Sequence, residues 1–555
     1  MSTPRLAAPL MAWIACLVIA AAADGEEVLY NGIRLPSPWP PRIERLTDEP
    51  MAVPYLASPP AVIPIDVGRQ LFVDDFLIEG TTLKRTFHRA EYCESNPVIR
   101  PDKPWEQAGK GAFAAVFSDG VWYDPAERLF KMWYLGSIFA STCYATSRDG
   151  LGWEKPALDV EAGTNVVHRL PRDSQTVWLD LAEKDPSRRF KMFTATTRQG
   201  RSGWFLAVRF SADGVHWSRE AAAESSPVGD RSTVFYNPFR KVWVYSIRSG
   251  TRGRDRTYRE CADPVAGATW SNDEKFLWVG ADKLDPHNPN PDFSAVTPEL
   301  YNLDAAAYES LMLGLFSIWQ GPSNAECAKR GIHKRNEVLV GFSRDGFHWQ
   351  RPDRRPFIGV NQQKGAWNWG NVQSAGGGCL VVGDRLYFYF SGRALGEKFW
   401  DGGGSTGLAT LRRDGFASID ADAQEGTLTT RPVLFTGSRL FVNADAARGE
   451  LAAEVLGEDG RVIEPFSRGN CAAIHADKTL QELAWKGADD LGAVSGKPVR
   501  FRFHLTRGSL YAFWVSAEKS GASRGYVAAG GPGFTSPTDT VGEAAYRAAA
   551  LPFIQ

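Results

Sequence analysis

The chain lacks an excess of charge of either sign, a long apolar run beyond its first residues, and the Cys-x-x-Cys spacing of a zinc site. It carries 63 Lys and Arg against 64 Asp and Glu in 555 residues. With this balance the chain has no net positive charge that would attract a nucleic acid or an anionic membrane. Beyond the N-terminal segment no 18 apolar residues follow one another. We therefore expect neither a nucleic acid nor a membrane as partner of the mature chain, and any charge selectivity must be local.

The N-terminal segment MSTPRLAAPLMAWIACLVIAAAADGEE combines one Arg, a short apolar run and small residues. Ala21 and Ala23 fit the positions before a signal-peptidase cut, which predicts a signal peptide over residues 1–23 and a secreted or periplasmic protein. An uncleaved N-terminal anchor is the alternative. The six cysteines that remain are too few for a disulfide framework, and we interpret them as mostly buried single thiols with at most one bridge.

Helical periodicity is scarce as well. From Phe72 onward, short β-branched and aromatic runs alternate with Gly, Asp, Asn and Pro, which predicts an all-β chain. The turn phrase Ser-x-Asp-Gly-x-x-Trp recurs at 147–153, 211–217 and 343–349, with relatives ending at Trp270 and starting at Arg412. A strand, hairpin and strand precede each turn, as in VWYDPAERLFKMWY from Val121. Five copies of this four-stranded unit predict a five-bladed β-propeller.

The predicted division of the mature chain follows the change in pattern. The later segment alternates inward and outward residues around Gly-Asp and Asp-Gly turns, which favours a β-sandwich. The expected units are an irregular lead-in over 24–67, the propeller over 68–425, the β-sandwich over 427–517, and a Gly- and Ser-rich tail over 518–555, extended or loosely held.

Two related strand phrases, DSQTVWLD and DRSTVFYN, place an acid at the head of an inner strand: Asp173 and Asp230. In a propeller blade the head of the first strand and the tail of the second open on the same face. The matching tails carry Arg198, Arg248 and Arg393, and the phrase WNWGNVQS adds Trp367, Trp369 and Asn371. We therefore expect acids, arginines and indoles at one mouth, although a strand-head Asp can instead serve packing or pair with the Arg of its own blade.

Two further acids are candidates. Glu260 lies in the loop RSGTRGRDRTYRECADP, which also contributes Arg254 and Tyr258. Glu299 falls within the fourth inner strand, where a charged group facing the axis is costly unless it is used or paired. The Ser-x-Asp-Gly-x-x-Trp turns, by contrast, lie on the far face and are assigned to packing.

Two carboxyl groups across a narrow mouth suit cleavage of a glycosidic bond, one giving a proton to the leaving oxygen and the other attacking the sugar or activating water. Arginines on several blades hint at an anionic group in the ligand. We expect no cofactor and no metal site of recognisable spacing. An axial calcium ion would need no sequence signature, and the loop over 282–293 could supply oxygen ligands.

Five blades with strand-head acids, followed by a sandwich, resemble the glycoside hydrolase families 32 and 43. LFVNADAARGELAAEVLGEDGRVI and LYAFWVS are similar to the family 32 sandwich, whereas QLFVDDFLIE, SRDGFHW, WNWGNVQS and GYVAAGGPG resemble exported proteins of planctomycete-like bacteria. The Trp-x-Asn-Asp-Pro-Asn-Gly and Arg-Asp-Pro phrases of family 32 are absent, and Glu260-Cys261 lies outside an inner strand. Asp173 and Asp230 match the acids of the family only in their position before the Val-aromatic pair of an inner strand.

Three hypotheses follow from these patterns. The first is a secreted glycoside hydrolase acting on a complex polysaccharide or oligosaccharide, acidic or neutral, through the Asp173 and Asp230 pair. The second is a non-catalytic carbohydrate-binding propeller, and the third is a phosphorylase or lyase on the same scaffold. The sequence leaves the sugar, the stereochemistry and the oligomeric state open.

Overall fold

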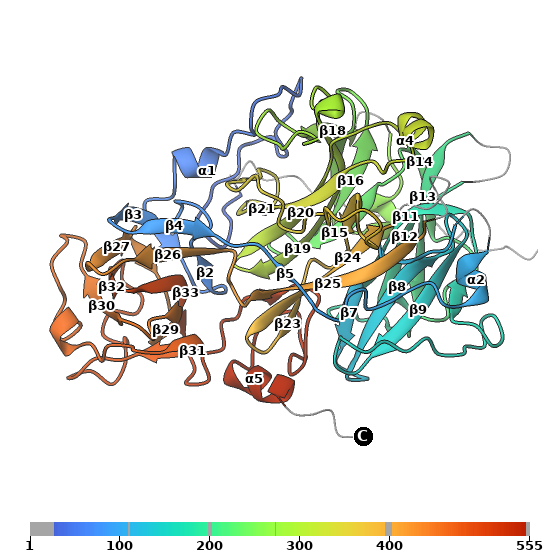
Figure 1. The fold of residues 1–555 in the computed structure, drawn as a ribbon. Helices are drawn as coiled ribbons and strands as arrows, with labels where there is room; N and C mark the ends of the chain where they lie inside the picture. Colours follow the sequence, from blue (N-terminus) through green and yellow to red (C-terminus); the bar gives the residue numbers. More distant parts are fainter. Residues whose placement is uncertain (1–26, 109–110, 198–201, 272–273, 395–401, 551–555) are drawn as a thin grey trace, which may run out of the picture.

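A computed structural model describes residues 27–108, 111–197, 202–271, 274–394 and 402–550 (Figure 1). The predicted signal peptide lies outside these residues. The described chain is dominated by antiparallel strands with a few short helices, as the all-β prediction requires. No helix in the described ranges is both long and apolar enough to cross a membrane.

Residues 114–279 form three separate sheets, each built from consecutive antiparallel strands. The first contains β6 (Ala114–Ala115), β7 (Val121–Asp124), β8 (Leu129–Gly136), β9 (Ser141–Ser147) and β10 (Val166–His168). The second contains β11 (Arg172–Leu179), β12 (Phe190–Thr196), β13 (Trp204–Ser211) and β14 (Ala223–Val228). The third contains β15 (Thr233–Asn237), β16 (Val242–Ser249), β17 (Asp255–Cys261) and β18 (Phe276–Val279).

The fourth and fifth strand groups join into one nine-stranded sheet, because β21 pairs with β22 at Asn336 and Asn371. The fourth group is β19 (Glu299–Glu309), β20 (Leu311–Trp319) and β21 (Asn336–Ser343). The fifth is β22 (Asn371–Ser374), β23 (Leu380–Val382), β24 (Arg385–Arg393) and β25 (Gly404–Arg412), with β5 (Glu91–Tyr92) at its edge.

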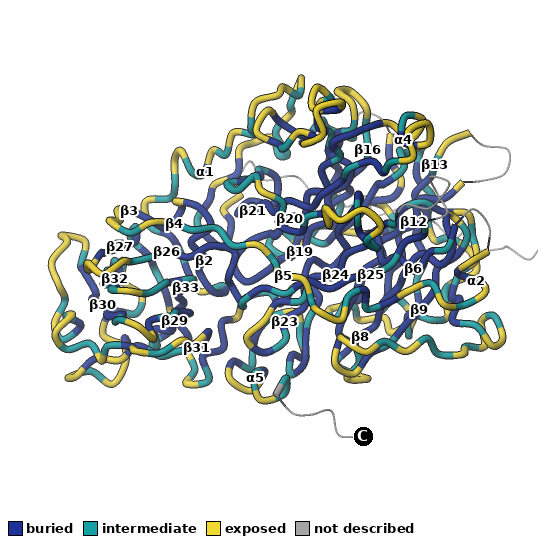
Figure 2. Tube along the Cα trace, viewed as in Figure 1, coloured by how far each residue is buried: buried dark blue, intermediate teal, exposed yellow. Residues whose placement is uncertain are grey.

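The first strands of these five groups contact one another in a closed series. The Val177 N–H donates to Asp119 O, next to the first group, at 2.7 Å. Ser174 Oγ donates to Ser232 O, and Thr233 Oγ1 donates to Leu303 O. Asp304 closes the series, because its carboxylate accepts hydrogen bonds from Ser118 and Ser374. These contacts bring the first strands together around a common centre. Figure 2 labels β19 among them and shows it as largely buried.

The repeated turns have one geometry at each of their three full copies. In each, the Ser hydroxyl accepts the Gly N–H, and the Asp Oδ1 accepts the two N–H groups that follow the Gly. The three glycines, Gly150, Gly214 and Gly346, have φ between +77° and +82°, which favours Gly. The predicted packing role is borne out at Gly214, whose carbonyl accepts the indole N–H of Trp133.

Gly214→Ala should therefore destabilise the protein. A Cβ at Gly214 would lie 2.5 Å from Cζ2 of Trp133, which is fully buried. Gly163→Ala is the matched control, because Gly163 has a φ of +77° and nothing within 4 Å of its Cβ position. We expect Gly214→Ala to lower the free energy of unfolding by about 1–3 kcal/mol more than Gly163→Ala in a urea titration. Equal losses would show that the backbone strain alone decides the cost.

The C-terminal strands form two further sheets, on the opposite side of the molecule from β8 and β9 (Figure 1). The larger contains β31 (Asp477–Leu483), β29 (Arg439–Asp445), β33 (Gly508–Ser516), β26 (Ala417–Ala421), β4 (Lys84–Phe87) and β2 (Gln70–Leu71). The smaller contains β3 (Ile78–Thr81), β27 (Gly426–Thr430), β32 (Arg500–Thr506) and β30 (Glu450–Leu456). One hydrophobic cluster, which includes Phe72, Leu440 and Phe503, fills the space between them.

These pairings correct two of the predicted boundaries. The strands within 70–87 and the strand at 417–421, predicted to belong to the propeller, pair with C-terminal strands. Phe72, Ile78 and Ile419 join the core between the two C-terminal sheets, whereas Leu71 and Ala417 pack in a neighbouring hydrophobic cluster. The predicted loose tail over 518–555 is ordered in its described part, 518–550, where β34 (Tyr526–Val527) pairs with β19 and α5 (Glu543–Ala550) follows. β1 (Ile63–Pro64), in the lead-in, pairs in parallel with β28 (Val433–Leu434).

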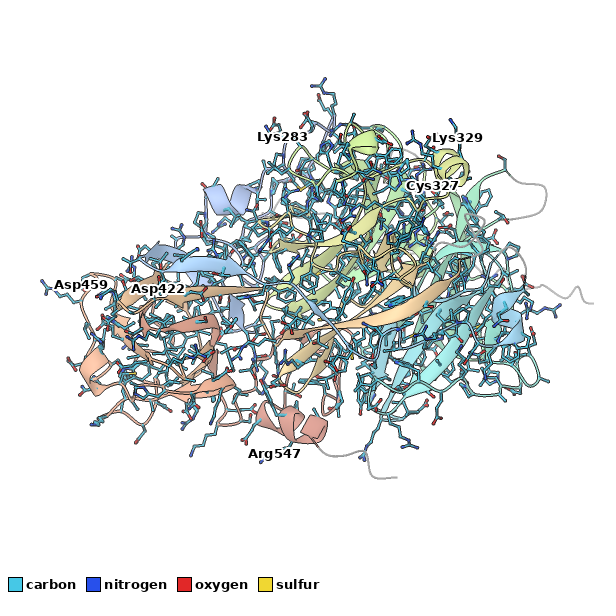
Figure 3. The ribbon with its side chains drawn as sticks, viewed as in Figure 1. Lys283, Cys327, Lys329, Asp422, Asp459 and Arg547 are labelled. Atoms are coloured by element: carbon cyan, nitrogen blue, oxygen red, sulfur yellow. The ribbon has the colours of Figure 1, made fainter. Side chains whose placement is uncertain are left out.

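The short helices are α1 (Pro54–Ala57), α2 (Pro104–Gln107), α3 (Pro264–Gly267) and α4 (Asn324–Arg330). α4 connects β20 with β21 and lies at the periphery, where Figure 3 labels Cys327 and Lys329. All six described cysteines are free thiols, so none of them forms a bridge.

Candidate active site

A cavity of about 130 Å³ lies where the heads of β11, β15 and β19 meet the end of β24. Its volume is smaller than that of most sites for drug-sized ligands and suits a single small ligand group. Its lining combines charged and apolar side chains: Phe117, Leu135, Ile138, Phe139, Asp173, Asp230, Arg231, Arg254, Tyr301, Asn324, Lys334 and Arg393. The two carboxylates expected at one mouth therefore share one cavity.

Asp173 reaches the cavity from a β-bulge. The register between β11 and β12 shifts between Arg172 and Gln175, so the segment that contains Asp173 leaves the regular ladder. Bulges re-aim side chains and are common beside active sites. The Asp173 carboxylate accepts the backbone N–H of Arg231 at 3.0 Å and lies 3.8 Å from that guanidinium.

Asp230 is held by two arginines. Arg254 binds it through two hydrogen bonds of 3.1 Å, and the Nε of Arg248 lies 3.5 Å from its Oδ1. Although burial opposes ionisation, these guanidiniums lower the pKa of Asp230 below its ordinary value. Asp230 is thus a carboxylate across the neutral pH range, with a quarter of its side chain exposed.

Arg231 follows Asp230 directly and turns into the cavity. Its φ of +58° is in the left-handed region, an unfavourable conformation for a residue with a Cβ. The side chain is 4% exposed, and its guanidinium lies 4.8 Å from the ring centre of Phe117. Its Nε and Nη2 make no hydrogen bond to the described part of the chain.

Tyr301 and Lys334 form a hydrogen-bonded pair in the wall. The Lys334 ammonium donates to the Tyr301 hydroxyl at 2.8 Å, and both side chains are buried. Arg254 lies 4.6 Å from the Tyr301 ring centre. Although burial raises the pKa of Tyr301, Lys334 and the neighbouring arginines outweigh it, so this pKa falls below its ordinary value. Burial lowers the pKa of Lys334.

Glu299 lies beside this group without lining the cavity. Its Oε2 is 4.0 Å from the Nε of Arg254, and its side chain is a quarter exposed. Burial raises the pKa of Glu299 despite the nearby Arg254 and Arg248. Glu299 therefore keeps its proton more readily than Asp230 does.

Two predicted site residues lie elsewhere. Glu260 is near the opposite end of β17 from Asp255, which at roughly 3.3 Å per residue places it far from the cavity. Its carboxylate pairs with Arg240 and accepts the hydroxyl hydrogen bond of Tyr258. Tyr258 is 1% exposed and packs against Trp278. Both are structural residues of the third sheet, which corrects their assignment to the site.

Of the remaining predicted residues, one lines the cavity and three lie away from it. Arg393 lines the cavity, with its guanidinium 5.1 Å from the Phe117 ring centre. Trp367 packs under β24, on Phe390 at 5.6 Å, and Asn371 is buried in β22, where its Oδ1 accepts a hydrogen bond from the Gln373 side chain. Neither Trp367, Trp369 nor Asn371 is among the lining residues. Arg198 lies outside the described residues.

No cluster of three or more His, Cys, Asp or Glu side chains among the described residues is arranged to hold a metal ion. In the loop over 282–293, considered for calcium, Asp282 and Asp285 form ion pairs with arginines. Asp282 binds Arg351 at 2.6 Å and Arg354 at 2.9 Å, and Asp285 binds Arg351 at 2.7 Å. Because these carboxylates are neutralised by guanidiniums, the loop is a poor calcium ligand.

Sequence reasoning missed Arg231, Tyr301 and Lys334. A signal existed for Tyr301, since it is two residues after Glu299 in the same strand and such residues face the same side. The register shift between Leu300 and Asn302 then places Tyr301 at a second bulge. Lys334 comes from the connection between α4 and β21, and no local pattern places that connection at the mouth.

A larger apolar cavity of about 380 Å³ lies toward the other end of the first strands, bordered by Trp122, Trp178, Tyr236 and Tyr526. Its only acid among the described lining residues is Asp180, so it offers no carboxylate pair. Of these two cavities, only the smaller, charged one brings two carboxylates together from the heads of the first strands, and we take it as the candidate active site.

No family model and no curated protein matches the chain. Similar solved structures include a thermostable family-43 glycoside hydrolase, 11% identical, covering 56% of this chain and 94% of that chain at a TM-score of 0.38. A glycosyl hydrolase from Bacteroides ovatus is 13% identical over 62% of this chain and 97% of that chain, with a TM-score of 0.37. An alpha-L-arabinofuranosidase from Lactobacillus brevis is 10% identical over 58% and 94%, also at 0.37.

The expected resemblance to family 43 thus recurs among solved structures. At these identities and TM-scores the likeness is too distant to carry an argument about this chain, so its function has to be inferred from the cavity.

Proposed function

We propose that the protein is a glycoside hydrolase that cleaves glycosidic bonds of a polysaccharide or oligosaccharide at the cavity of Asp173 and Asp230. The observation that carries this proposal is the convergence of both carboxylates on one small cavity from the heads of neighbouring strand groups. Most enzymes that cleave glycosidic bonds use two carboxyl groups that face one bound sugar. The closed series of five first strands supports a five-bladed β-propeller as the scaffold, followed by a β-sandwich.

We assign separate tasks to the acids. Asp230, kept ionised by Arg254, is suited to attack the sugar carbon or to activate water. Asp173 lies beside it and supports the positive charge that develops on the sugar ring. Glu299 lies outside the lining, next to Arg254, and is the proposed proton donor to a leaving group that extends out of the cavity, because burial favours its protonated form.

A screen of the mature protein against a panel of polysaccharides, with product analysis, tests this function. New reducing ends are expected from at least one polymer. An unsaturated product would indicate a lyase instead, and turnover only in the presence of phosphate would indicate a phosphorylase.

The proton-donor assignment predicts the pH profile of kcat. A group that must be protonated supports catalysis below its pKa and stops doing so as the pH rises through it. Because burial raises the pKa of Glu299, the alkaline limb should lie above the range of an ordinary glutamate. Glu299→Gln should lower kcat about 10²- to 10⁴-fold and remove this limb. An unchanged limb in the variant would assign the proton donor to another group.

A second candidate is a non-catalytic carbohydrate-binding protein. The bidentate pairing of Asp230 with Arg254 favours it, because a carboxylate that neutralises a buried guanidinium also has a structural use. This candidate predicts sugar binding without any bond cleavage across the panel.

Export of the mature chain is proposed from residues 1–23 and is tested by N-terminal sequencing of the secreted protein.

A further inference from the structure

We propose that the larger apolar cavity is a second binding site, which takes an uncharged aromatic molecule carrying a hydrogen-bond acceptor. Among the described residues, it shares no lining residue with the candidate active site. The two cavities lie toward opposite ends of the first strands, so a ligand in one does not occupy the other. This second site does not depend on the proposed function.

The size and the lining of this cavity suit a small organic ligand. Its volume of about 380 Å³ falls within the usual range for such sites, roughly 300–1,000 Å³. Its lining is mainly apolar and includes five aromatic residues: Trp122, Tyr123, Trp178, Tyr236 and Tyr526. Aromatic side chains interact favourably with another ring, either stacked with an offset or edge to face. The lining therefore favours a ligand with an aromatic ring.

The cavity holds no unbalanced buried charge. Among the described lining residues, the only acid is Asp180 and the only base is Lys241. Asp180 pairs with Lys191 at 2.9 Å and accepts the backbone N–H of Ala182. Lys241 is exposed, so solvent screens its charge. A charged ligand group would lose its hydration in the cavity without gaining a counter-charge there, which favours an uncharged ligand.

One donor of the lining has no partner. The indole N–H of Trp178 makes no hydrogen bond within the described part of the chain, although the residue is only 8% exposed. The neighbouring indole of Trp122, by contrast, donates to Val177 O at 2.8 Å, as a buried indole usually does. The unbonded indole nitrogen of Trp217 is shut off from solvent, whereas that of Trp178 is not, so a ligand can reach it. A ligand acceptor such as an ester carbonyl would satisfy this donor.

Two phenol groups add further donors. Tyr236 and Tyr526 are half-buried, and their hydroxyls make no hydrogen bond to other described residues. Burial raises the pKa of both side chains, so each keeps its proton at neutral pH. Each phenol is thus able to donate to an oxygen of the ligand.

The C-terminal segment builds one wall of the cavity and fixes its shape. Residues 526–530 belong to the lining. The Ala528 N–H donates to Ala307 O, and the Tyr123 N–H donates to Ala529 O, both at 3.0 Å. Ala528 keeps a φ of +48°, a left-handed conformation that costs energy for a residue with a Cβ and is enriched at ligand sites. The wall is thus in place before a ligand binds, which lowers the entropic cost of binding.

The test compares two uncharged ligands by calorimetry on the mature wild-type protein. Methyl 4-hydroxybenzoate supplies an aromatic ring and an ester carbonyl, whereas methyl β-glucoside supplies a ring and acceptors without aromaticity. We expect the ester to bind about 10- to 100-fold more tightly than the glucoside. Binding of neither compound, or binding of the glucoside as tightly as the ester, would overturn the proposed site.

Two variants locate the bound ester. Trp178→Phe keeps an aromatic ring but removes the N–H, and should weaken ester binding about 3- to 10-fold. Trp217→Phe is its matched control, because Trp217 does not line the cavity. Ala307→Leu removes space that the ring needs and should weaken ester binding at least about 10-fold. Its control is Ala447→Leu, at an exposed position of the C-terminal unit, which should bind as the wild type does.

The urea midpoint of each variant shows whether it is folded. An unchanged affinity in folded Ala307→Leu would place the ester elsewhere and overturn the site, and an unchanged affinity in Trp178→Phe would overturn the assigned hydrogen bond. The two variants differ in kind, and wild-type discrimination needs neither, so misfolding of one variant does not leave the site untested.

Cleavage of the polysaccharide panel gives a separate result. Ala307→Leu should leave any cleavage at the wild-type rate, because Ala307 does not line the candidate active site. If the ester binds selectively but the panel yields no cleavage, the hydrolase proposal fails and the second site stands. If a polymer is cleaved but the ester does not bind, the hydrolase stands and the second site fails.

Discussion

Asp230→Asn should lower kcat on a cleaved polysaccharide by about 10²- to 10⁴-fold while sugar binding changes little. The amide keeps the size of the side chain but supplies no negative charge to attack the sugar or to take a proton from water. The carboxylate is ionised in the wild type because Arg254 and Arg248 flank it. Asp173→Asn should cause a loss of similar order, since both groups act on one bound sugar. The measurement is steady-state kinetics together with calorimetric binding.

The matched control is Asp459→Asn. Asp459 is exposed, carries the same carboxyl group, and lies at the far edge of the C-terminal sheets (Figure 3). Its replacement should leave kcat and binding at wild-type values. If Asp173→Asn and Asp230→Asn retain full turnover, the cavity is not the catalytic centre. If the wild type binds sugars but cleaves none, the binding-protein candidate replaces the enzyme.

Arg413→Met should destabilise the protein by about 3–5 kcal/mol. The Arg413 side chain is fully buried, with Nη2 3.2 Å from both Glu309 and Asp539. Glu309 also lies 3.5 Å from Arg69, which binds Asp414 at 2.8 Å. Removing one guanidinium leaves buried carboxylates with too little positive charge, and that desolvation cost is the source of the loss. The free energy of unfolding is measured from the urea midpoint and slope.

This cluster also explains why the parts of the chain hold together. Its members come from the segment before β2, the end of β19, the turn after β25, and the C-terminal segment, four places far apart in sequence. Arg547→Met is the control, because Arg547 projects from α5 at the periphery and is 72% exposed (Figure 3). A loss for Arg413→Met no larger than that for Arg547→Met would contradict the prediction.

The repeating strands and turns could be predicted from the sequence because their causes are local. A strand needs β-branched and aromatic residues, and the Ser-x-Asp-Gly-x-x-Trp turn needs a glycine with positive φ and side chains that bond its own backbone. The hairpins from Val121, Val177 and Val234 follow the same local rules and pair as expected. Asp173 and Asp230 were placed together because every copy of a repeat presents corresponding positions to the same face.

The predictions that missed needed information from distant segments. The sequence predicts Glu260 in a loop at the mouth, whereas in the structure the pairing of its strand with β16 continues through Cys261. The strands within 70–87 join C-terminal partners that begin more than 300 residues later, and no local pattern names them.

The sequence alone determined the all-β class, the repeated unit and the acids at two strand heads, since these depend on propensity and on periodicity within a few residues. Only the tertiary structure decided which side chains share the cavity. Two bulges direct Asp173 and Tyr301, a left-handed backbone directs Arg231, and the connection after α4 brings in Lys334. Each of these depends on contacts between segments that are remote in the chain, and such contacts leave no periodic mark in either partner.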